Sequence, residues 1–406
     1  MPDSVSTRHE LRWGEAKSCT AAFKLMRPPV RPSAAASFRN LTRRFAAEPP
    51  PSRPRRVWEL IPFGFELQML SLHLRTLRGV VDAFFIAESN ITHQGAFKHP
   101  MLSLALRRGD FPPLLAEKIH LEVVGLLANG SHPHCGPVPN GYSYKFVECL
   151  DEFQRYVPLR MVLPRLAPSD LVLMADFDEI AQPRAVDLLR RCFPFDPEGG
   201  EPGVLMLIAH MFTYGLHCVA PGGWHYGPKL ASGGYLLRNF APFSDAHTPR
   251  RAYNAIRQRT KFGSVSMDDA GWHFSSFGPV EALHRKYTSW SHARQFTGTT
   301  SAKIAKNGYE NDTLSPERLD RCAKFCLEPT ASMCQALAVP CDWKHFLSRR
   351  VPPCLSRSDE QSRKIPGRLL VATTQLRSPA FSLPPLLLNS PEEFKDYYRF
   401  LGVDRR

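Results

Sequence analysis

The segment from residue 57 to residue 87 restricts the fold of this chain more than any other part of it. Val57–Pro62 is a short apolar run, leucines recur at helical spacing between Phe65 and Leu77, and Val80–Ala87 is rich in β-branched and aromatic residues. A strand as apolar as the second one is typical of a parallel sheet that is covered on both faces. The segment therefore predicts a βαβ unit with parallel strands and a right-handed crossover.

A second unit of the same kind follows. We expect a helix over Gln154–Leu166, a buried strand over Leu171–Ala175 and a helix that Pro183 opens and that runs through Arg191. The sequence also predicts strands at Gly203–Phe212 and Gly234–Leu237 and helices at Val280–Trp290 and Pro391–Leu401. The predicted fold is an α/β fold with a mostly parallel central sheet flanked by helices.

Composition limits the classes of protein to which the chain can belong. Hydrophobic residues make up 43% of the 406 residues, which is enough for a sizeable core. The net charge is +14, of which +8 lies in residues 1–56. We find no stripe of basic and aromatic residues and no zinc-finger or RNA-binding signature, so the charge does not predict nucleic-acid binding. The sequence has no apolar run of 18 residues, so no transmembrane segment is expected, and no secretory signal is evident.

The termini and the cysteines predict further regions. Residues 1–55 are basic and rich in Ser, Ala and Pro, which favours a disordered segment; a targeting peptide, a stem or a mis-predicted start are the alternatives. Residues 314–382 are irregular and carry five of the ten cysteines, for which we favour disulfides over reduced thiols. These five are Cys322, Cys326, Cys334, Cys341 and Cys354.

The strongest chemical signal is Asp176-Phe177-Asp178-Glu179, which directly follows the predicted strand Leu171–Ala175. Ligands of open parallel sheets bind at the carboxyl ends of the strands. Carboxylates at such an end suit a hard divalent ion, Mn2+ or Mg2+, that neutralises a diphosphate. The alternatives are an acidic loop that caps the next helix and a haloacid-dehalogenase-like phosphotransferase, although Ile180 replaces the Thr that the second chemistry uses.

Two further motifs supply polar groups. Glu88 to Lys98 follows the strand Val80–Ala87 and suits a nucleotide or a sugar, or is an ordinary polar loop. In Gly271-Trp272-His273-Phe274-Ser275, Trp272 offers a flat apolar face and His273 a nitrogen ligand. On the following helix, Glu281 suits a general base and Lys286 a phosphate contact, unless both are solvated helix charges.

Together these segments resemble glycosyltransferase family 17. The resemblance runs from about residue 57 to about residue 300, with a weaker similarity at Leu383-Pro384-Pro385 and Asn389. The matching pieces are Glu66-Leu67 with Leu70, VVDAFFIAESNITHQG, EFQR at 152–155, DLVLMADFDEI and GWHFSSFGPVEALHRKY.

The resemblance implies a nucleotide-diphospho-sugar transferase fold of the GT-A kind and an inverting reaction. It implies transfer of N-acetylglucosamine from UDP-GlcNAc to a mannose-containing N-glycan or glycoprotein acceptor, as a β-1,4-mannosyl-glycoprotein 4-β-N-acetylglucosaminyltransferase does, in the lumen of the Golgi. The expected metal ligands are Asp176, Asp178 and His273. Glu281 is the expected base, with Asp269 as second choice. The expected donor-binding residues are Glu88, Asn90, Thr92, Gly95, Lys98, Arg155, Trp272 and Lys286.

The sequence departs from the family pattern in the first helix, where an Arg is usual at His73 and an acid at Thr76. The proline usual after Gly95 is displaced to Pro100, and the membrane anchor of a Golgi member is not seen, which leaves a cytoplasmic or organellar location open. We expect a catalytic domain over residues 56–313 and a helix within 383–406 that packs back on it. The non-enzymatic alternative is a carbohydrate-binding protein on the same fold, with Trp224 and Trp272 as sugar platforms.

Overall fold

The computed structural model describes the greater part of the expected catalytic domain and short pieces outside it. The described residues are 19, 26–27, 53–128, 130–140, 143–192, 203–213, 215–240, 256, 265–289, 383–390 and 392–394. Among them, no helix is both long and apolar enough to cross a lipid bilayer.

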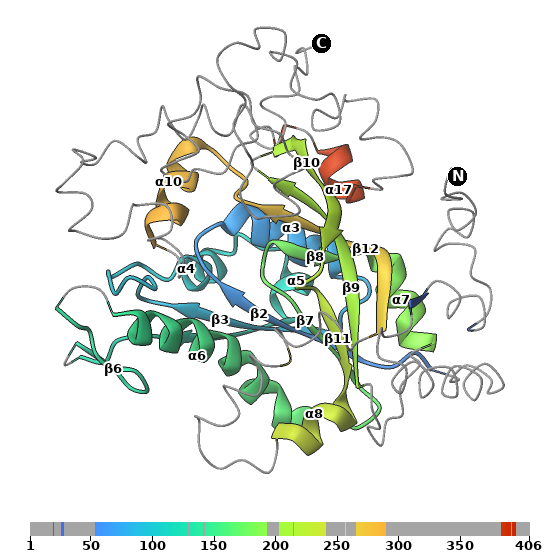
Figure 1. The fold of residues 1–406 in the computed structure, drawn as a ribbon, viewed down its shortest axis with the longest axis horizontal. Coiled ribbons are helices and arrows are strands. Elements are labelled where there is room, and N and C mark those ends of the chain that lie inside the picture. The colour runs from blue at the N-terminus through green and yellow to red at the C-terminus, as the bar shows by residue number, and fades with distance from the viewer. Residues whose placement is uncertain are drawn as a thin grey trace, which may run out of the picture.

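The described residues form one large mixed sheet (Figure 1). Its strands follow the order β1-β12-β9-β11-β7-β2-β3-β4, with β8 paired to β12 and β10 paired to β9. The block β7-β2-β3-β4 is parallel, whereas β11 runs antiparallel between β7 and β9. The bounds are β1 Met26–Arg27, β2 Val57–Phe63, β3 Ala83–Ser89, β4 Ile119–Val124, β7 Leu171–Met174, β8 Glu179–Ala181, β9 Val204–Thr213, β10 Gly215–Trp224, β11 Lys229–Ser232 and β12 Val265–Ser275.

Helices cover both faces of this sheet, as the sequence predicts (Figure 1). On one face α3 and α7 pack against Ile61 and Phe84, and on the other α6 and α8 pack against Leu60 and Phe85. Neighbouring residues of β2 and β3 thus belong to two separate hydrophobic cores, because successive side chains of a strand point to opposite faces of the sheet. The helices are α3 Leu67–Leu77, α4 Met101–Arg108, α5 Pro113–Ala116, α6 Tyr144–Val162 with the 3-10 turn Leu163–Arg165, α7 Pro183–Cys192, α8 Gly233–Phe240, α10 Val280–Ser289 and α17 Pro385–Asn389.

Most of the predicted elements are present, and one has the wrong type. The structure confirms both βαβ segments and the helix that Pro183 opens. Gly234–Leu237, predicted as a strand, lies in the helix α8. Ser232 Oγ accepts a hydrogen bond from the Tyr235 amide (3.2 Å) at the start of this helix, and Leu236 and Phe240 share one buried face. A run of four apolar residues does not distinguish a helix from a strand by its period.

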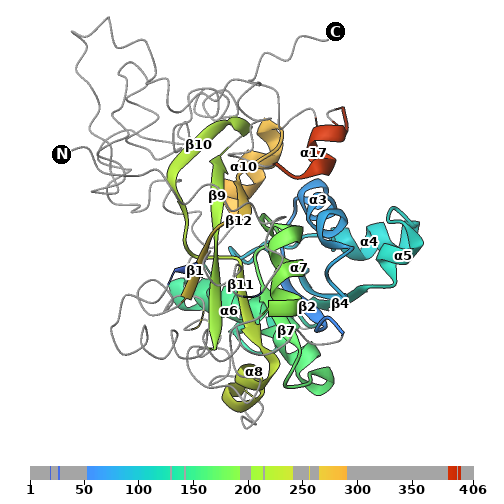
Figure 2. The ribbon, with the colours of Figure 1, turned by 90° about the vertical axis from the view of Figure 1, so that its right-hand side faces the viewer.

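Two boundaries also differ from the prediction. Helix α6 begins at Tyr144, ten residues before the predicted start, and Ser143 caps it through a hydrogen bond from the Phe146 amide (3.3 Å). Of the predicted helix Pro391–Leu401 only 392–394 are described, so this prediction lies outside the described residues. The described residues of 383–394 pack on α3, beside which Figure 2 shows α17.

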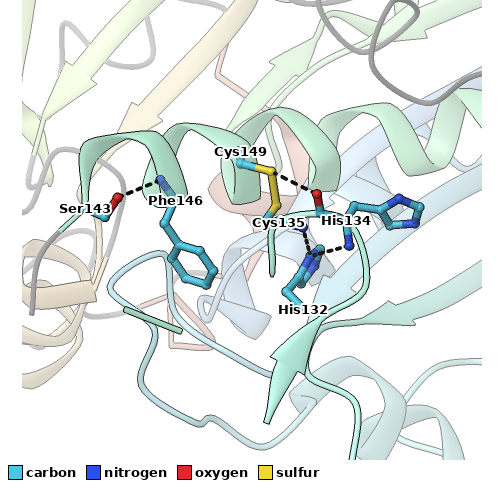
Figure 3. The surroundings of a disulfide bond; sticks show 6 residues. All are labelled: His132, His134, Cys135, Ser143, Phe146 and Cys149. Carbon is cyan, nitrogen blue, oxygen red and sulfur yellow. Dashed lines mark hydrogen bonds between the residues drawn. A yellow bond between two sulfur atoms is a disulfide. The ribbon is translucent and has the colours of Figure 1, made fainter. Parts of the chain in front are cut away.

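Four cysteines form two disulfides, neither of them in the predicted cysteine-rich region, which lies outside the described residues. Cys19 is bonded to Cys192 of α7, and Met26–Arg27 pair with β12, so these described parts of the first 55 residues contact the fold. Cys135 is bonded to Cys149 of α6 (Figure 3). This second bond ties the loop that holds β5 Ser131–His132 and β6 Gly136–Pro137 to the helix.

We predict that the double substitution Cys135→Ser/Cys149→Ser lowers the free energy of unfolding by about 3 kcal/mol, the chain-entropy value for a closed loop of about 15 residues. Chemical denaturation of both proteins under non-reducing conditions measures the difference. Equal midpoints with equal slopes would contradict the prediction.

Candidate active site

Three loops meet at the carboxyl edge of the parallel block. The segment Gly64–Glu66 follows β2, the segment 90–98 follows β3, and Ala175–Asp178 follows β7. The strands are parallel and in register, with Leu60 opposite Met174 and Phe63 opposite Glu88, so these three loops leave the same edge of the sheet. This is the edge where the sequence analysis placed the ligand site.

Asp178 is a buried acid of this edge, with 7% of its surface exposed. One carboxylate oxygen, Oδ2, accepts a hydrogen bond from Lys286 Nζ at 3.0 Å, and Lys286 donates at the same distance to Glu66 Oε1. The other oxygen, Oδ1, faces His273 Nε2 at 3.7 Å. Burial opposes a charged Lys286, but the carboxylates of Asp178 and Glu66 outweigh it and raise the pKa of this ammonium well above its usual range, so Lys286 is a cation.

Asp176 contacts a different cation. Its Oδ1 accepts a hydrogen bond from Arg155 Nη1 of α6, and Arg155 Nε also donates to Asp151 (3.2 Å) one helical turn earlier. Burial opposes the charged guanidinium, yet the two carboxylates raise the pKa of Arg155 further above its usual range. The Asp176 amide donates to Glu179 Oε2 (2.9 Å), which orders the turn between the two aspartates.

Glu179 and Trp224 connect the acidic loop to the neighbouring strands. Trp224 Nε1 donates to Glu179 Oε1 (2.6 Å), and its ring lies against the ring of His273, with centroids 4.3 Å apart. Gly227 is required beside this contact, because a Cβ there would lie 2.2 Å from Glu179 Oε2. The loop is therefore fixed from β12 and β10 as well as from the helices.

A buried His73–Glu59 pair supports the middle of the acidic loop. His73 Nδ1 lies 3.0 Å from the Phe177 carbonyl oxygen and His73 Nε2 lies 2.8 Å from Glu59 Oε1, and both side chains are fully buried. Burial disfavours the imidazolium, but the carboxylate of Glu59 and both hydrogen bonds outweigh it and raise the pKa of His73. The pair joins α3 and β2 to the residue between the two aspartates.

The polar residues after β3 mostly bond to their own backbone. Both carboxylate oxygens of Glu88 accept amide hydrogens of the first turn of α4, from Leu102 and Ser103, at 3.0 Å each. Asn90 Oδ1 accepts the Leu126 amide at 2.9 Å. These two side chains, for which donor binding stays a prediction, hold the loop and the start of α4 in place.

A tight turn accounts for two further residues of this loop. Thr92 Oγ1 accepts the Ala96 amide at 3.1 Å, and Gly95 has a φ of +87°, which favours glycine. A Cβ on Gly95 would also lie 2.9 Å from Val138 Cγ1. Lys98 ends the loop and donates a hydrogen bond to the Gly64 carbonyl oxygen at 2.7 Å. Burial lowers the pKa of the Lys98 ammonium to about 8, although the carboxylates of Glu88 and Glu66 act in the opposite direction.

Three expected site residues lie apart from the acidic loop. Trp272 is 2% exposed and packs in the core, opposite Ile180. Asp269 pairs with His210 at 3.4 Å. It lies five residues before Phe274, whose amide donates to the Asp178 carbonyl oxygen. Five residues of a strand span about 16 Å, which separates Asp269 from the acidic loop. Glu281 is exposed on the first turn of α10, the helix that also carries Lys286.

Comparison with known families places this edge in context. Residues 49–216, which include β2, β3, α6 and the Asp176–Asp178 loop, match the model of glycosyltransferase family 17. These residues form a glycosyltransferase family 17 domain. The family is one of hexosyltransferases, enzymes that use a sugar donor and an acceptor. A search of individual curated proteins finds no match.

This edge of the sheet offers residues of the right type for a divalent ion. Carboxylate oxygens together with an imidazole suit Mn2+ or Mg2+. His273 Nδ1 is buried without a hydrogen-bond partner, and Nε2 lies beyond hydrogen-bond distance of Asp178. As they stand, no three His, Cys, Asp or Glu side chains in the described residues converge closely enough to hold a metal ion. The residue types fit a metal, and Lys286 lies between two of the acids.

Sequence reasoning missed the supporting groups of the family 17 site. Glu66 was noted for the resemblance alone, His73 as a departure from the family pattern, and Glu59 not at all. Lys286 lies 220 residues after Glu66 in the chain, and no local pattern joins the two. The signal that could have pointed to Glu66 is its place three residues after the apolar strand β2, since a place after a strand also identified Asp176.

We predict a pH-dependent stability contribution from His73. Because its pKa is raised on folding, this contribution is fully present below the unfolded pKa of about 6.5 and is lost as the pH rises through the folded pKa. The free energy of unfolding of wild type minus that of His73→Gln should therefore decrease from pH 6 toward higher pH. Urea denaturation across this range measures it, and a difference that is constant with pH would refute the assignment.

Proposed function

We propose that the protein transfers N-acetylglucosamine from UDP-GlcNAc to a mannose-containing N-glycan, with inversion at the anomeric carbon and with a divalent ion as cofactor. The observation that supports this best is the enclosed acid Asp178 with Lys286 and His273, at the ligand-binding edge of a family 17 domain. The GT-A kind of fold is part of the same proposal, which the parallel block and its edge loops support.

The diphosphate of the donor requires positive charge at this edge. Asp176, Asp178 and His273 are the residues that we propose to hold the ion, which when bound supplies the charge that stabilises the leaving diphosphate. Arg155 of α6 and Lys286 of α10 are cations of the chain itself that contact this loop, and each is placed by a carboxylate partner. We propose that Lys286 also contacts the phosphates.

The acceptor approaches from solvent, and its base has to be accessible. We propose Glu281 for this role, since it is exposed and precedes Lys286 on α10 by five residues, about 7.5 Å along the helix axis. A carboxylate there takes the proton of the acceptor hydroxyl as that oxygen attacks the anomeric carbon and the bond to the UDP oxygen breaks.

The location that we propose is the lumen of the secretory pathway. The family and the two disulfides support it, because structural disulfides persist in oxidising compartments.

Asp178→Asn should abolish the stabilisation that UDP-GlcNAc with Mn2+ gives to the wild type, because the variant removes the charge that attracts the ion. A thermal shift with and without Mn2+ measures this. Asp187→Asn on α7, an exposed pair partner of Arg191, is the matched control and should respond as wild type does. Stabilisation by free glycan alone, with no effect of donor or metal, would favour the carbohydrate-binding alternative.

Glu281→Gln should lower kcat by about 10^2- to 10^4-fold, the usual contribution of a general base, and leave donor affinity unchanged. Steady-state kinetics with defined N-glycan acceptors and UDP-GlcNAc measure the effect. Glu148→Gln, an exposed glutamate of α6, is the matched control. Near-normal turnover of Glu281→Gln would rule out this base.

A further inference from the structure

His93 lies over the carboxyl ends of two parallel strands, where Gln154 of α6 holds it. Gln154 Nε2 donates to the carbonyl oxygen of Phe63, the last residue of β2, at 2.7 Å, and to that of Ala87 in β3 at 3.0 Å. Gln154 Oε1 lies 3.2 Å from His93 Nε2. The imidazole therefore rests on the edge of the sheet at which such folds bind their ligands.

The bonds of Gln154 fix the tautomer of His93. A glutamine side chain has two amide hydrogens, and both are used at the two strand carbonyls. A flipped amide would place its oxygen against two carbonyl oxygens, with no hydrogen between them. Gln154 Oε1 is therefore an acceptor, and His93 Nε2 carries the hydrogen of their bond. In the neutral ring the free lone pair then lies on Nδ1.

The ring of His93 is uncharged at neutral pH. Burial lowers the pKa of His93 from its usual 6.5, and the cations Arg155 of α6 and Lys98 of the same loop lower it further. The carboxylate of Asp151 and the bond to Gln154 act in the opposite direction without reversing the shift. Nδ1 is thus a hydrogen-bond acceptor at the pH of a neutral solution.

His93 is fixed on two sides and keeps one acceptor unused. Its backbone amide donates to the carbonyl oxygen of Ser289, the last residue of α10, at 3.1 Å. Within the described part of the chain, Nε2 makes the only hydrogen bond of the side chain. The ring is half-buried, and Nδ1 is not sealed from solvent. A rigidly held acceptor of this kind can fix the orientation of a ligand.

The neighbours of His93 restrict the ligand group that Nδ1 can bind. Arg155 and Lys98, the two cations that act on its pKa, are of the type that binds phosphate oxygens. A neutral lone pair cannot, because a phosphate oxygen is itself an acceptor. A sugar nucleotide such as UDP-GlcNAc also has uncharged donors, namely its hydroxyls and the N–H groups of the uracil and the acetamido group. These are the groups that match Nδ1.

We propose that His93 Nδ1 accepts a hydrogen bond from an uncharged O–H or N–H group of the sugar nucleotide, with Gln154 fixing the ring from the opposite side. His93 is then a binding residue of the donor site, and Gln154 is a positioning residue. The inference deepens the proposed function and rests on it, since it requires that a sugar nucleotide binds at this edge.

Two substitutions separate the two ring nitrogens. His93→Gln places its amide near the position of Nε2, so it keeps the bond to Gln154 and loses the acceptor at Nδ1. Its affinity for UDP-GlcNAc should be about tenfold weaker, the effect of one lost hydrogen bond, and its thermal unfolding midpoint should equal that of wild type. Isothermal titration calorimetry on the full chain, in a constant excess of Mn2+, measures the affinity.

His93→Asn has the opposite effect. Its side-chain oxygen lies near the position of Nδ1, whereas the contact with Gln154 is lost. This variant should bind UDP-GlcNAc nearly as tightly as wild type and unfold at a lower temperature. His99→Gln, an exposed histidine six residues later, is the matched control and should behave as wild type in both measurements.

UDP in place of UDP-GlcNAc identifies the bonded group. A tenfold loss by His93→Gln with both ligands supports the proposal and assigns the group to the uridine. A loss with UDP-GlcNAc alone supports it and assigns the group to the N-acetylglucosamine.

The remaining outcomes separate this inference from the proposed function. Equal affinity of wild type and His93→Gln for both ligands overturns the role of Nδ1 and leaves the proposed function standing. Equal weakening by His93→Gln and His93→Asn does the same, because it indicates a structural role of the ring. Absence of UDP-GlcNAc binding by wild type overturns both.

Discussion

The compensation of buried acids at one edge of the sheet is the interaction on which the site depends. Asp178 is paired with Lys286, Asp176 with Arg155 and Glu59 with His73. The three basic partners come from α10, α6 and α3, so three helices far apart in sequence hold one short loop. Removal of one partner from such a pair leaves a buried charge uncompensated, which costs more than the pair itself contributes. The order of the loop is therefore a property of the whole fold.

The part of the fold that sequence could predict is the part that is periodic. Val57–Phe63, Ala83–Ser89 and Leu171–Met174 are apolar runs of strand length, and they lie in the sheet as expected. Their parallel order fixed the edge at which Asp176 and Asp178 had to lie. The helix α8 was mistaken for a strand because its apolar run is short and its start depends on one capping contact of Ser232.

The side chains of the site were harder to predict than its place. Glu88 lies near the end of β3 and Asn90 directly follows it, yet their oxygens accept amide hydrogens of nearby backbone. A polar residue at the end of a strand can bind a ligand or satisfy the free amides of the next helix, and local sequence does not distinguish the two. The contact between Glu66 and Lys286 was hard to predict for a different reason. The two residues are 220 positions apart in the sequence, and no local pattern indicates that they meet.

The balance of charge at this edge also decides what can bind there. Asp151 and Asp176 share Arg155, and Asp178 and Glu66 share Lys286, so each group of two acids has one cation. Lys98 is the next cation along the edge, and burial lowers its pKa to about 8. A nucleotide diphosphate is itself negative and would be repelled by an excess of carboxylates in a place of low dielectric. The edge therefore needs an additional positive charge before it can accept such a donor. The divalent ion of the proposed function would supply this charge.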